Sequence, residues 1–129
     1  GGGGCFPLHY DNAGSVSRRV LTVLVYLNPG WCQGDGGEIE LVPWLRPAVR
    51  VPPLHNRAVL FSSERVMHRV LPAARQRYCL TFWLHSHHCE GDVPVRLPRA
   101  GDESEFRQAL ASLGKSAAQR VLSRAVYAE

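Results

Sequence analysis

A histidine and an aspartate, His9 and Asp11, stand two residues apart near the start of this 129-residue chain. Phe6 and Pro7 before the pair favour an extended backbone, and Asn12 after it favours a turn. In an extended segment the side chains of residues i and i+2 point to the same face. His9 and Asp11 can therefore form a hydrogen-bonded pair or bind one metal ion. The pair alone is unspecific, because a polar strand end that enters a turn has the same composition.

A third metal ligand is available in His68, which follows Asp11 by 57 residues. It comes after a predicted strand and a short turn, so a closed β structure can bring it beside the first pair. Two imidazoles and one carboxylate form the ligand set of octahedral Fe(II) sites that keep open positions.

A basic residue, Arg77, stands nine residues after His68, at the start of an apolar strand. An interior arginine needs a fixed anion, and its planar guanidinium binds a carboxylate through two parallel hydrogen bonds. The alternative is an arginine at a strand edge whose charged head lies in water.

Short strands are expected to position these side chains. Apolar and β-branched runs bounded by turn residues predict strands at 20–27, 38–42, 49–51, 56–62, 67–71 and 77–84. The first run is apolar on both faces, so we expect it to be covered on both. In the last run, alternation puts Arg77, Cys79, Thr81 and Trp83 on one face. This pattern predicts a mainly β fold, a sandwich or jelly roll.

The C-terminal part of the chain has helical periodicity instead. Asp102 and the acidic residues after it predict a helix start, and Gly114 predicts its end. Ser116 predicts the cap of a second helix with apolar residues on one side. We therefore expect a core over 1–90, followed by a linker and helical extension over 91–129.

The composition, 45% hydrophobic and 20% charged, indicates a globular protein. No apolar run approaches the ~20 residues that span a membrane. The net charge of +4 is scattered rather than gathered in a stripe, so we expect no nucleic-acid partner. The four cysteines form no Cys-x-x-Cys pair, which argues against a disulfide framework and favours a reducing compartment. The chain opens on four glycines without Met, so we expect a domain whose start is missing.

A second metal-binding hypothesis concerns the run from His85 to Cys89, which holds three histidines and a cysteine. Such residues can bind Zn(II), but this run lacks the paired spacing of structural zinc sites. A solvated loop after the last strand is the interpretation that we favour.

Taken together, these motifs resemble the Fe(II)- and 2-oxoglutarate-dependent dioxygenases, in their prolyl 4-hydroxylase-like branch. The resemblance covers roughly residues 3–85, about two thirds of the chain, and identifies an N-terminally truncated domain. The segments that carry it are His9 to Asn12, Arg19 to Asn28, Gly36 to Ile39, Asn56 to Phe61, His68 to Val70 with Pro72 and Ala73, and Arg77 to Trp83.

The resemblance implies a double-stranded β-helix fold, a jelly roll, with Fe(II) bound by His9, Asp11 and His68. It also implies that 2-oxoglutarate binds the iron and that its far carboxylate pairs with Arg77. An arginine at this position is more similar to the hypoxia-inducible-factor prolyl hydroxylases than to the collagen branch, which uses lysine. The remaining cosubstrate contacts that it implies are a hydrogen bond from Tyr26 to the same carboxylate, pocket-lining Thr22 and Thr81, and a wall formed by Trp83.

The implied reaction hydroxylates a protein side chain, with proline as the expected target. It converts 2-oxoglutarate and O2 to succinate and CO2, and L-ascorbate keeps the iron reduced. A protein or peptide is the expected partner, and the cytoplasm or nucleus is the favoured location. The alternative function is a catalytically inactive metal-binding or interaction fragment that retains the jelly-roll fold.

Overall fold

The computed structural model describes residues 4–12, 17–87, 101–114 and 116–127. The chain divides into two compact units, Gly1–His87 and His88–Glu129. The core boundary expected at residue 90 lies outside the described residues. Within the described ranges, no helix is both long enough and apolar enough to cross a membrane.

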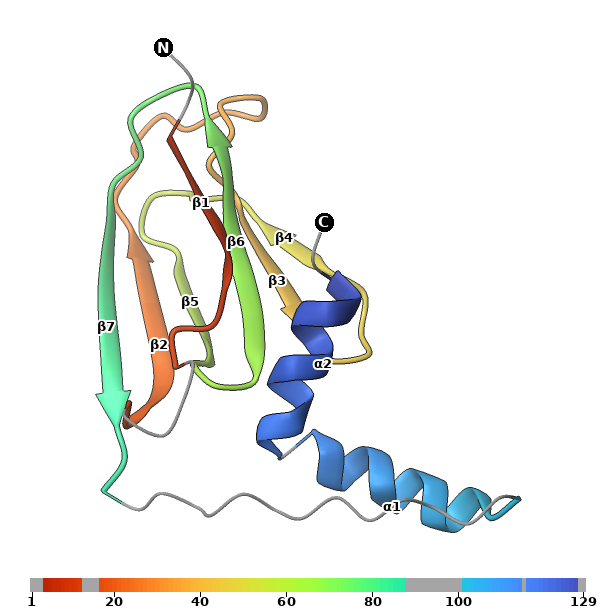
Figure 1. The fold of residues 1–129 in the computed structure, drawn as a ribbon. Helices are drawn as coiled ribbons and strands as arrows, with labels where there is room; N and C mark the ends of the chain where they lie inside the picture. Colours follow the sequence, from red (N-terminus) through yellow and green to blue (C-terminus); the bar gives the residue numbers. More distant parts are fainter. Residues whose placement is uncertain (1–3, 13–16, 88–100, 115, 128–129) are drawn as a thin grey trace. The chain divides into compact units, whose positions relative to one another are not determined.

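The first unit consists of two antiparallel sheets (Figure 1). One sheet has the strand order β1-β6-β3-β4 and the other has the order β5-β2-β7. This arrangement confirms the predicted mainly β fold. The strands are β1 (Gly4–His9), β2 (Arg19–Tyr26), β3 (Ile39–Pro43), β4 (Val49–Val51), β5 (Ala58–Ser62), β6 (Val66–Ala73) and β7 (Cys79–His85).

The hydrophobic core gathers around one face of β2. Alternation along this central strand buries Thr22, Leu24 and Tyr26, of which Thr22 and Tyr26 are fully inaccessible. The core cluster consists of Leu24, Tyr26, Ile39, Val59 and Phe61. It joins β2 and β5 of one sheet to β3 of the other, as in a sandwich.

The prediction that β2 is covered on both faces is wrong for the part of the chain that the structure describes. Val23 on the outer face pairs with Leu60 of β5 and Phe82 of β7, and these two neighbours are 59% and 50% exposed. Apolar residues of both parities thus stand on a sheet that buries only one face. β-branched residues suit the pleated backbone on either face, so their presence did not require a covering layer.

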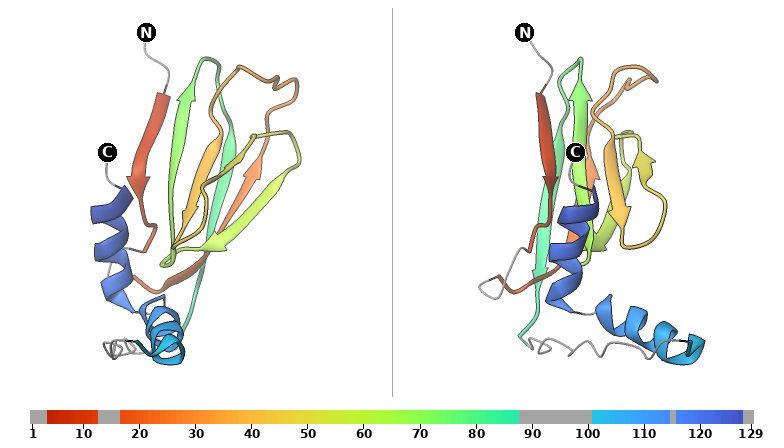
Figure 2. Two further views of the ribbon diagram at one scale, coloured as in Figure 1. Left: turned by 90° about the vertical axis from the view of Figure 1, so that its right-hand side faces the viewer. Right: turned by 45° about the vertical axis from the view of Figure 1, so that its right-hand side comes forward.

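The sheet that contains β6 brings distant parts of the chain together. β6 pairs with β1 on one side and with β3 on the other, so that His68 stands opposite His9 and also opposite Leu41. β1 is an edge strand of this sheet (Figures 1 and 2). Its register with β6 is irregular. This pairing decides where two of the predicted metal ligands meet.

The second unit contains the two helices predicted from the C-terminal pattern, α1 (Glu103–Leu113) and α2 (Ala117–Tyr127). Asp102 caps α1, because its carboxylate accepts a hydrogen bond from Glu105 N at 2.9 Å. Gly114 ends that helix. Ser116 Oγ accepts a hydrogen bond from Ala118 N at 3.2 Å, as expected of a cap.

Candidate active site

The segment that carries the first two predicted ligands leaves the sheet between them. β1 ends at His9, and Asp11 lies in a bend. The expectation that both residues lie on one strand is therefore wrong. The backbone after Asp11 turns away from β6 because Asn12 N donates to Ser63 O at 3.0 Å, and Asn12 Nδ2 donates to Arg19 O at 2.8 Å.

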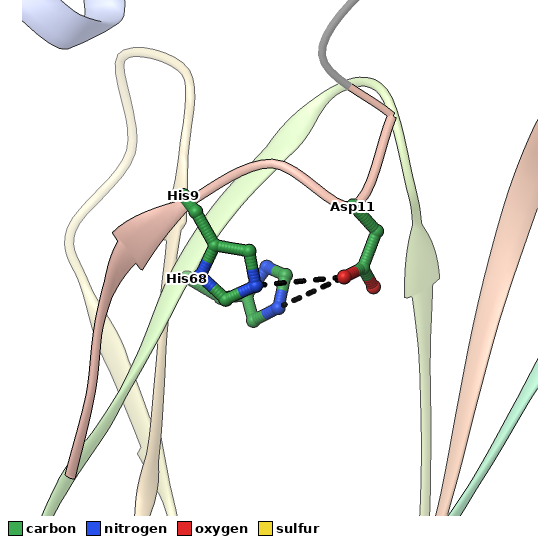
Figure 3. Close-up of side chains that lie close together, drawn as sticks. All are labelled: His9, Asp11 and His68. Carbon is green, nitrogen blue, oxygen red and sulfur yellow. Dashed lines mark ion pairs between the residues drawn. The ribbon is translucent and has the colours of Figure 1, made fainter. Parts of the chain in front are cut away.

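The side chains of His9, Asp11 and His68 nevertheless converge (Figure 3). His9 Nε2 lies 3.5 Å from Asp11 Oδ1, and His68 Nε2 lies 3.8 Å from the same oxygen. The two imidazole rings have centroids 4.2 Å apart. One potential ligand atom of each residue lies within 4.8 Å of the other two. These are the three residues whose convergence the sequence predicted.

In both histidines one ring nitrogen lies near a backbone carbonyl and the other lies near Asp11. Nδ1 of His9 lies 2.7 Å from Pro7 O, and Nδ1 of His68 lies 3.3 Å from Val66 O. A carbonyl oxygen only accepts, so each Nδ1 carries the proton and each Nε2 keeps a lone pair when the ring is neutral. Such hydrogen bonds orient imidazoles that bind metals.

The pKa values of Asp11 and His68 favour the forms that bind metals, whereas the pKa of His9 is shifted toward the protonated form. Burial raises the pKa of Asp11, but the contacts with His9 and Thr22 outweigh burial and hold it far below its ordinary value. The Asp11 carboxylate in turn raises the pKa of His9. Burial, reinforced by the charge of His9, lowers the pKa of His68 to about 4. At neutral pH Asp11 is thus ionised and His68 is neutral, as ligation requires.

A cavity of about 690 Å³ adjoins these side chains. The three converging residues line it together with Arg77, Thr81 and Trp83. Leu24, Ile39 and Val70 give it an apolar wall. The cavity is large enough for a small dicarboxylate and part of a further substrate.

Arg77 and Tyr26 provide a second polar position. Arg77 Nε donates to Gly37 O at 2.8 Å, and its guanidinium carbon lies 4.9 Å from the centroid of the Tyr26 ring. The Tyr26 hydroxyl is buried and has no hydrogen-bond partner within the described ranges, and no described carboxylate pairs with Arg77. Burial raises the pKa of Tyr26, so its hydroxyl is a neutral donor. A cation beside an unpartnered donor suits a carboxylate ligand.

Gly37 contributes its backbone to this position. In the sequence, only the family resemblance had pointed to this residue. Its φ is +77°, and a Cβ there would lie 2.9 Å from Arg77 Cδ and 3.1 Å from Ala73 Cβ. A glycine therefore lets the arginine stem lie against the loop while the Gly37 carbonyl holds Nε. The two consecutive glycines, Gly36 and Gly37, were the available signal.

The residues predicted to contact the cosubstrate differ in whether they line the cavity. Thr81 and Trp83 line the cavity, whereas Thr22 and Tyr26 are fully buried. The hydroxyl of Thr22 is engaged by Asp11 Oδ2 at 2.6 Å, so its contact with a cosubstrate stays a prediction. The Arg19 guanidinium stacks on the ring of Trp83 at 4.0 Å, a contact that no motif signalled.

The alternative zinc site cannot be placed, because His88 and Cys89 lie outside the described residues. His85 is the last residue of β7, and His87 is exposed. Among the described residues, only His9, Asp11 and His68 form a group suited to a metal ion.

The comparisons with known proteins agree with this geometry. A family model, the 2OG-Fe(II) oxygenase superfamily, matches residues 1–85. A prolyl 4-hydroxylase structure from Phytophthora capsici is 46% identical with a TM-score of 0.85, covering 97% of this chain and 43% of that one. A Trichoplax adhaerens prolyl hydroxylase, solved with a hypoxia-inducible-factor peptide fragment, is 37% identical with a TM-score of 0.59, covering 63% and 37%. These likenesses confirm the predicted jelly-roll fold.

Two curated sequences are also similar to part of the chain. The hypoxia-inducible factor prolyl hydroxylase of Caenorhabditis elegans is 33% identical over 86 residues, which are 64% of this chain and 12% of that protein. Mouse prolyl hydroxylase EGLN3 is also 33% identical over 86 residues, which are 36% of its length. The chain thus spans less than half the length of each relative.

Proposed function

The chain belongs to the 2OG-Fe(II) oxygenase superfamily, as its motifs predicted, and we propose that it hydroxylates a proline side chain in a protein or peptide. The observation that carries the proposal is the convergence of two histidines and one aspartate beside a cavity that also holds an arginine. This donor set is the one that Fe(II) oxygenases use, with open positions for a cosubstrate and O2.

In this proposal His9, Asp11 and His68 hold the iron, and Arg77 with Tyr26 holds the far carboxylate of 2-oxoglutarate. The bound iron, O2 and 2-oxoglutarate together supply the oxidising chemistry, which yields succinate, CO2 and a hydroxylated product. L-Ascorbate is proposed as the reductant that keeps the iron active.

The chain itself contributes orientation and exclusion of water. Arg77 is held by the Gly37 carbonyl, so its guanidinium is pre-oriented before a carboxylate arrives. The apolar residues Leu24 and Ile39 line the cavity near the ligands and limit the water that can enter. Both effects favour a reaction in which 2-oxoglutarate is consumed only together with hydroxylation of the substrate.

The substrate proposal rests on the relatives and on one apolar surface. Relatives that are prolyl hydroxylases include one solved with a peptide fragment. In this chain, Phe6 is 55% exposed and lines the cavity, with its ring 4.6 Å from that of His9. An exposed aromatic ring at this distance offers a packing surface to a pyrrolidine ring.

The proposal is tested by measuring succinate formed from 2-oxoglutarate with Fe(II), ascorbate and proline-containing peptides. Each peptide is paired with a version in which alanine replaces the proline. We expect succinate to depend on proline and to be lost in His68→Ala. Arg77→Ala should raise the KM for 2-oxoglutarate about 10- to 100-fold through the loss of a charged hydrogen bond, and Arg77→Lys should raise it less.

Two results would contradict the proposal. Turnover that is unchanged in His68→Ala would remove the metal site from the reaction. Metal binding by His9, Asp11 and His68 without any turnover of 2-oxoglutarate would favour the alternative of an inactive binding fragment.

A further inference from the structure

The two oxygens of the Asp11 carboxylate have different surroundings. Oδ1 faces the imidazoles of His9 and His68. Oδ2 accepts a hydrogen bond from the Thr22 hydroxyl at 2.6 Å, which is within the short range of charge-assisted bonds between a hydroxyl and a carboxylate. Because Asp11 lies in a bend rather than in a strand, its backbone pairing does not fix the direction of this side chain.

Thr22 is a rigid anchor for that bond. It lies in β2, the central strand of its sheet, where it stands opposite Phe61 on one side and Trp83 on the other. Its side chain is fully buried, and a β-branched residue in a strand has few alternative rotamers. The hydroxyl therefore stays in one place relative to the sheet.

The direction of the Thr22 proton is set by a second buried hydroxyl. Ser63 Oγ lies 2.8 Å from Thr22 Oγ1, and Ser63 is also fully buried. The Asp11 carboxylate can only accept, so the single hydroxyl proton of Thr22 is donated to Asp11. Ser63 must then donate to Thr22, which gives a hydrogen-bonded chain from Ser63 through Thr22 to Asp11.

Ser63 also fixes the backbone around the aspartate. Its N donates to Val20 O at 3.1 Å, and its O accepts from Asn12 N at 3.0 Å. The residue that orients the Thr22 hydroxyl thus also ties the segment after Asp11 to β2. A residue with only a packing role would not need both its backbone groups and its hydroxyl in these positions.

We propose that Thr22 and Ser63 are positioning residues that keep Asp11 bound to the metal through one oxygen. A carboxylate that bound through both oxygens would take a further coordination position, which the cosubstrate or O2 needs. With Oδ2 occupied by Thr22, Oδ1 alone points at the site. This inference rests on the proposed metal site but concerns residues that do not touch the metal.

The experiment measures metal binding without turnover. Mn(II) is titrated into the full chain, and the free ion is followed by its electron paramagnetic resonance signal. We expect Thr22→Val to weaken Mn(II) binding about 10- to 100-fold, as is typical when a group that orients a ligand is removed. Ser63→Ala should weaken it less, and Thr22→Ser, which restores the hydroxyl, should recover most of the affinity.

Ser62→Ala is the matched control. Ser62 is the neighbour of Ser63 but pairs with Leu21 on the opposite face of the sheet, so its loss should leave Mn(II) binding unchanged. Absorption spectra of the Co(II)-loaded proteins provide a second measurement. Their band positions and intensities should change in Thr22→Val and return in Thr22→Ser, which a purely structural role would not produce.

The outcomes separate this inference from the proposed function. If His68→Ala loses Mn(II) binding while Thr22→Val and Ser63→Ala bind it like the unmodified protein, the positioning role is wrong and the metal site stands. If the unmodified protein binds no Mn(II), both proposals fall. Should Thr22→Val not fold, as judged by circular dichroism, Ser63→Ala and Thr22→Ser still decide the question.

Discussion

Replacing Tyr26 with phenylalanine should have opposite effects on folding and on cosubstrate binding. The Tyr26 hydroxyl is fully buried and without a hydrogen-bond partner among the described residues. Leaving such a group unsatisfied costs about 1–3 kcal/mol. The Tyr26→Phe variant, which keeps the ring and its contact with the Arg77 guanidinium, should therefore be more stable than the original protein by about 1 kcal/mol or more without ligand.

The same change should weaken the binding of 2-oxoglutarate. A hydrogen bond to a charged group contributes about 1.5–3 kcal/mol, so its loss corresponds to an affinity about 10- to 100-fold lower. Arg77 remains in place and should retain part of the affinity. The stabilised variant is thus expected to be the poorer binder, as when a binding site keeps an unsatisfied group for its ligand.

Two measurements test this pair of effects on the metal-free and the Mn(II)-loaded protein. Urea unfolding gives the stability without cosubstrate, and calorimetric titration with Mn(II) present gives the affinity for 2-oxoglutarate. A Tyr26→Phe variant that is less stable than the original would mean that the hydroxyl is already satisfied, and the reasoning would be refuted. Unchanged affinity for 2-oxoglutarate would remove Tyr26 from the carboxylate position.

Three further predictions concern stability. The pKa of His68 falls from 6.5 to about 4 on folding, so the unfolded chain binds the extra proton. The contribution of His68 to the stability of the metal-free protein should fall between pH 6.5 and 4, by up to about 3 kcal/mol, while the raised pKa of His9 acts in the opposite direction. Urea midpoints should therefore fall less over this pH range in His68→Gln than in the original protein. Gly36→Ala would place a Cβ in steric overlap with Pro72 O and should lower the melting temperature more than Gly34→Ala, which shares the positive φ but has open space. Glu40→Gln removes a buried charge bonded to Arg50 Nε at 2.7 Å and Arg69 Nε at 2.6 Å. It should cost about 1–3 kcal/mol at pH 7, and this difference should vanish as pH falls through the lowered pKa of Glu40; an equal difference at pH 3 would contradict it.

The sequence predicted those features that depend on local chemistry. Helix α1 begins and ends where Asp102 and Gly114 indicated, because caps act within one turn of the chain. The family was identified because residues that can bind a metal or a carboxylate, such as His68 and Arg77, stand at separations typical of that family. Most strands lie within two residues of their predicted ranges, since turn residues bound them.

The sequence could not predict features that depend on contacts between distant segments. Asp11 leaves the strand of His9 because Ser63 holds the following backbone, and nothing local to Asp11 encodes that bond. The hydrogen bond from Thr22 to Asp11 likewise requires β2 to lie beside the bend. Apolar residues on both faces of β2 showed that the strand could be buried, but not that only one of its faces would be.

The position of β1 at the edge of its sheet links metal loading to the docking of a strand. Among the described strands β1 pairs only with β6, four of its six residues are exposed, and His9 is its last residue. An ion shared by His9 and His68 would tie the two strands together by a bond that the metal-free chain lacks. By thermodynamic linkage, the ion favours the docked strand by the same factor as the docked strand favours the ion. The availability of metal would then determine how often β1 separates from β6. It would therefore also determine how accessible this sheet edge is to proteases and to other chains.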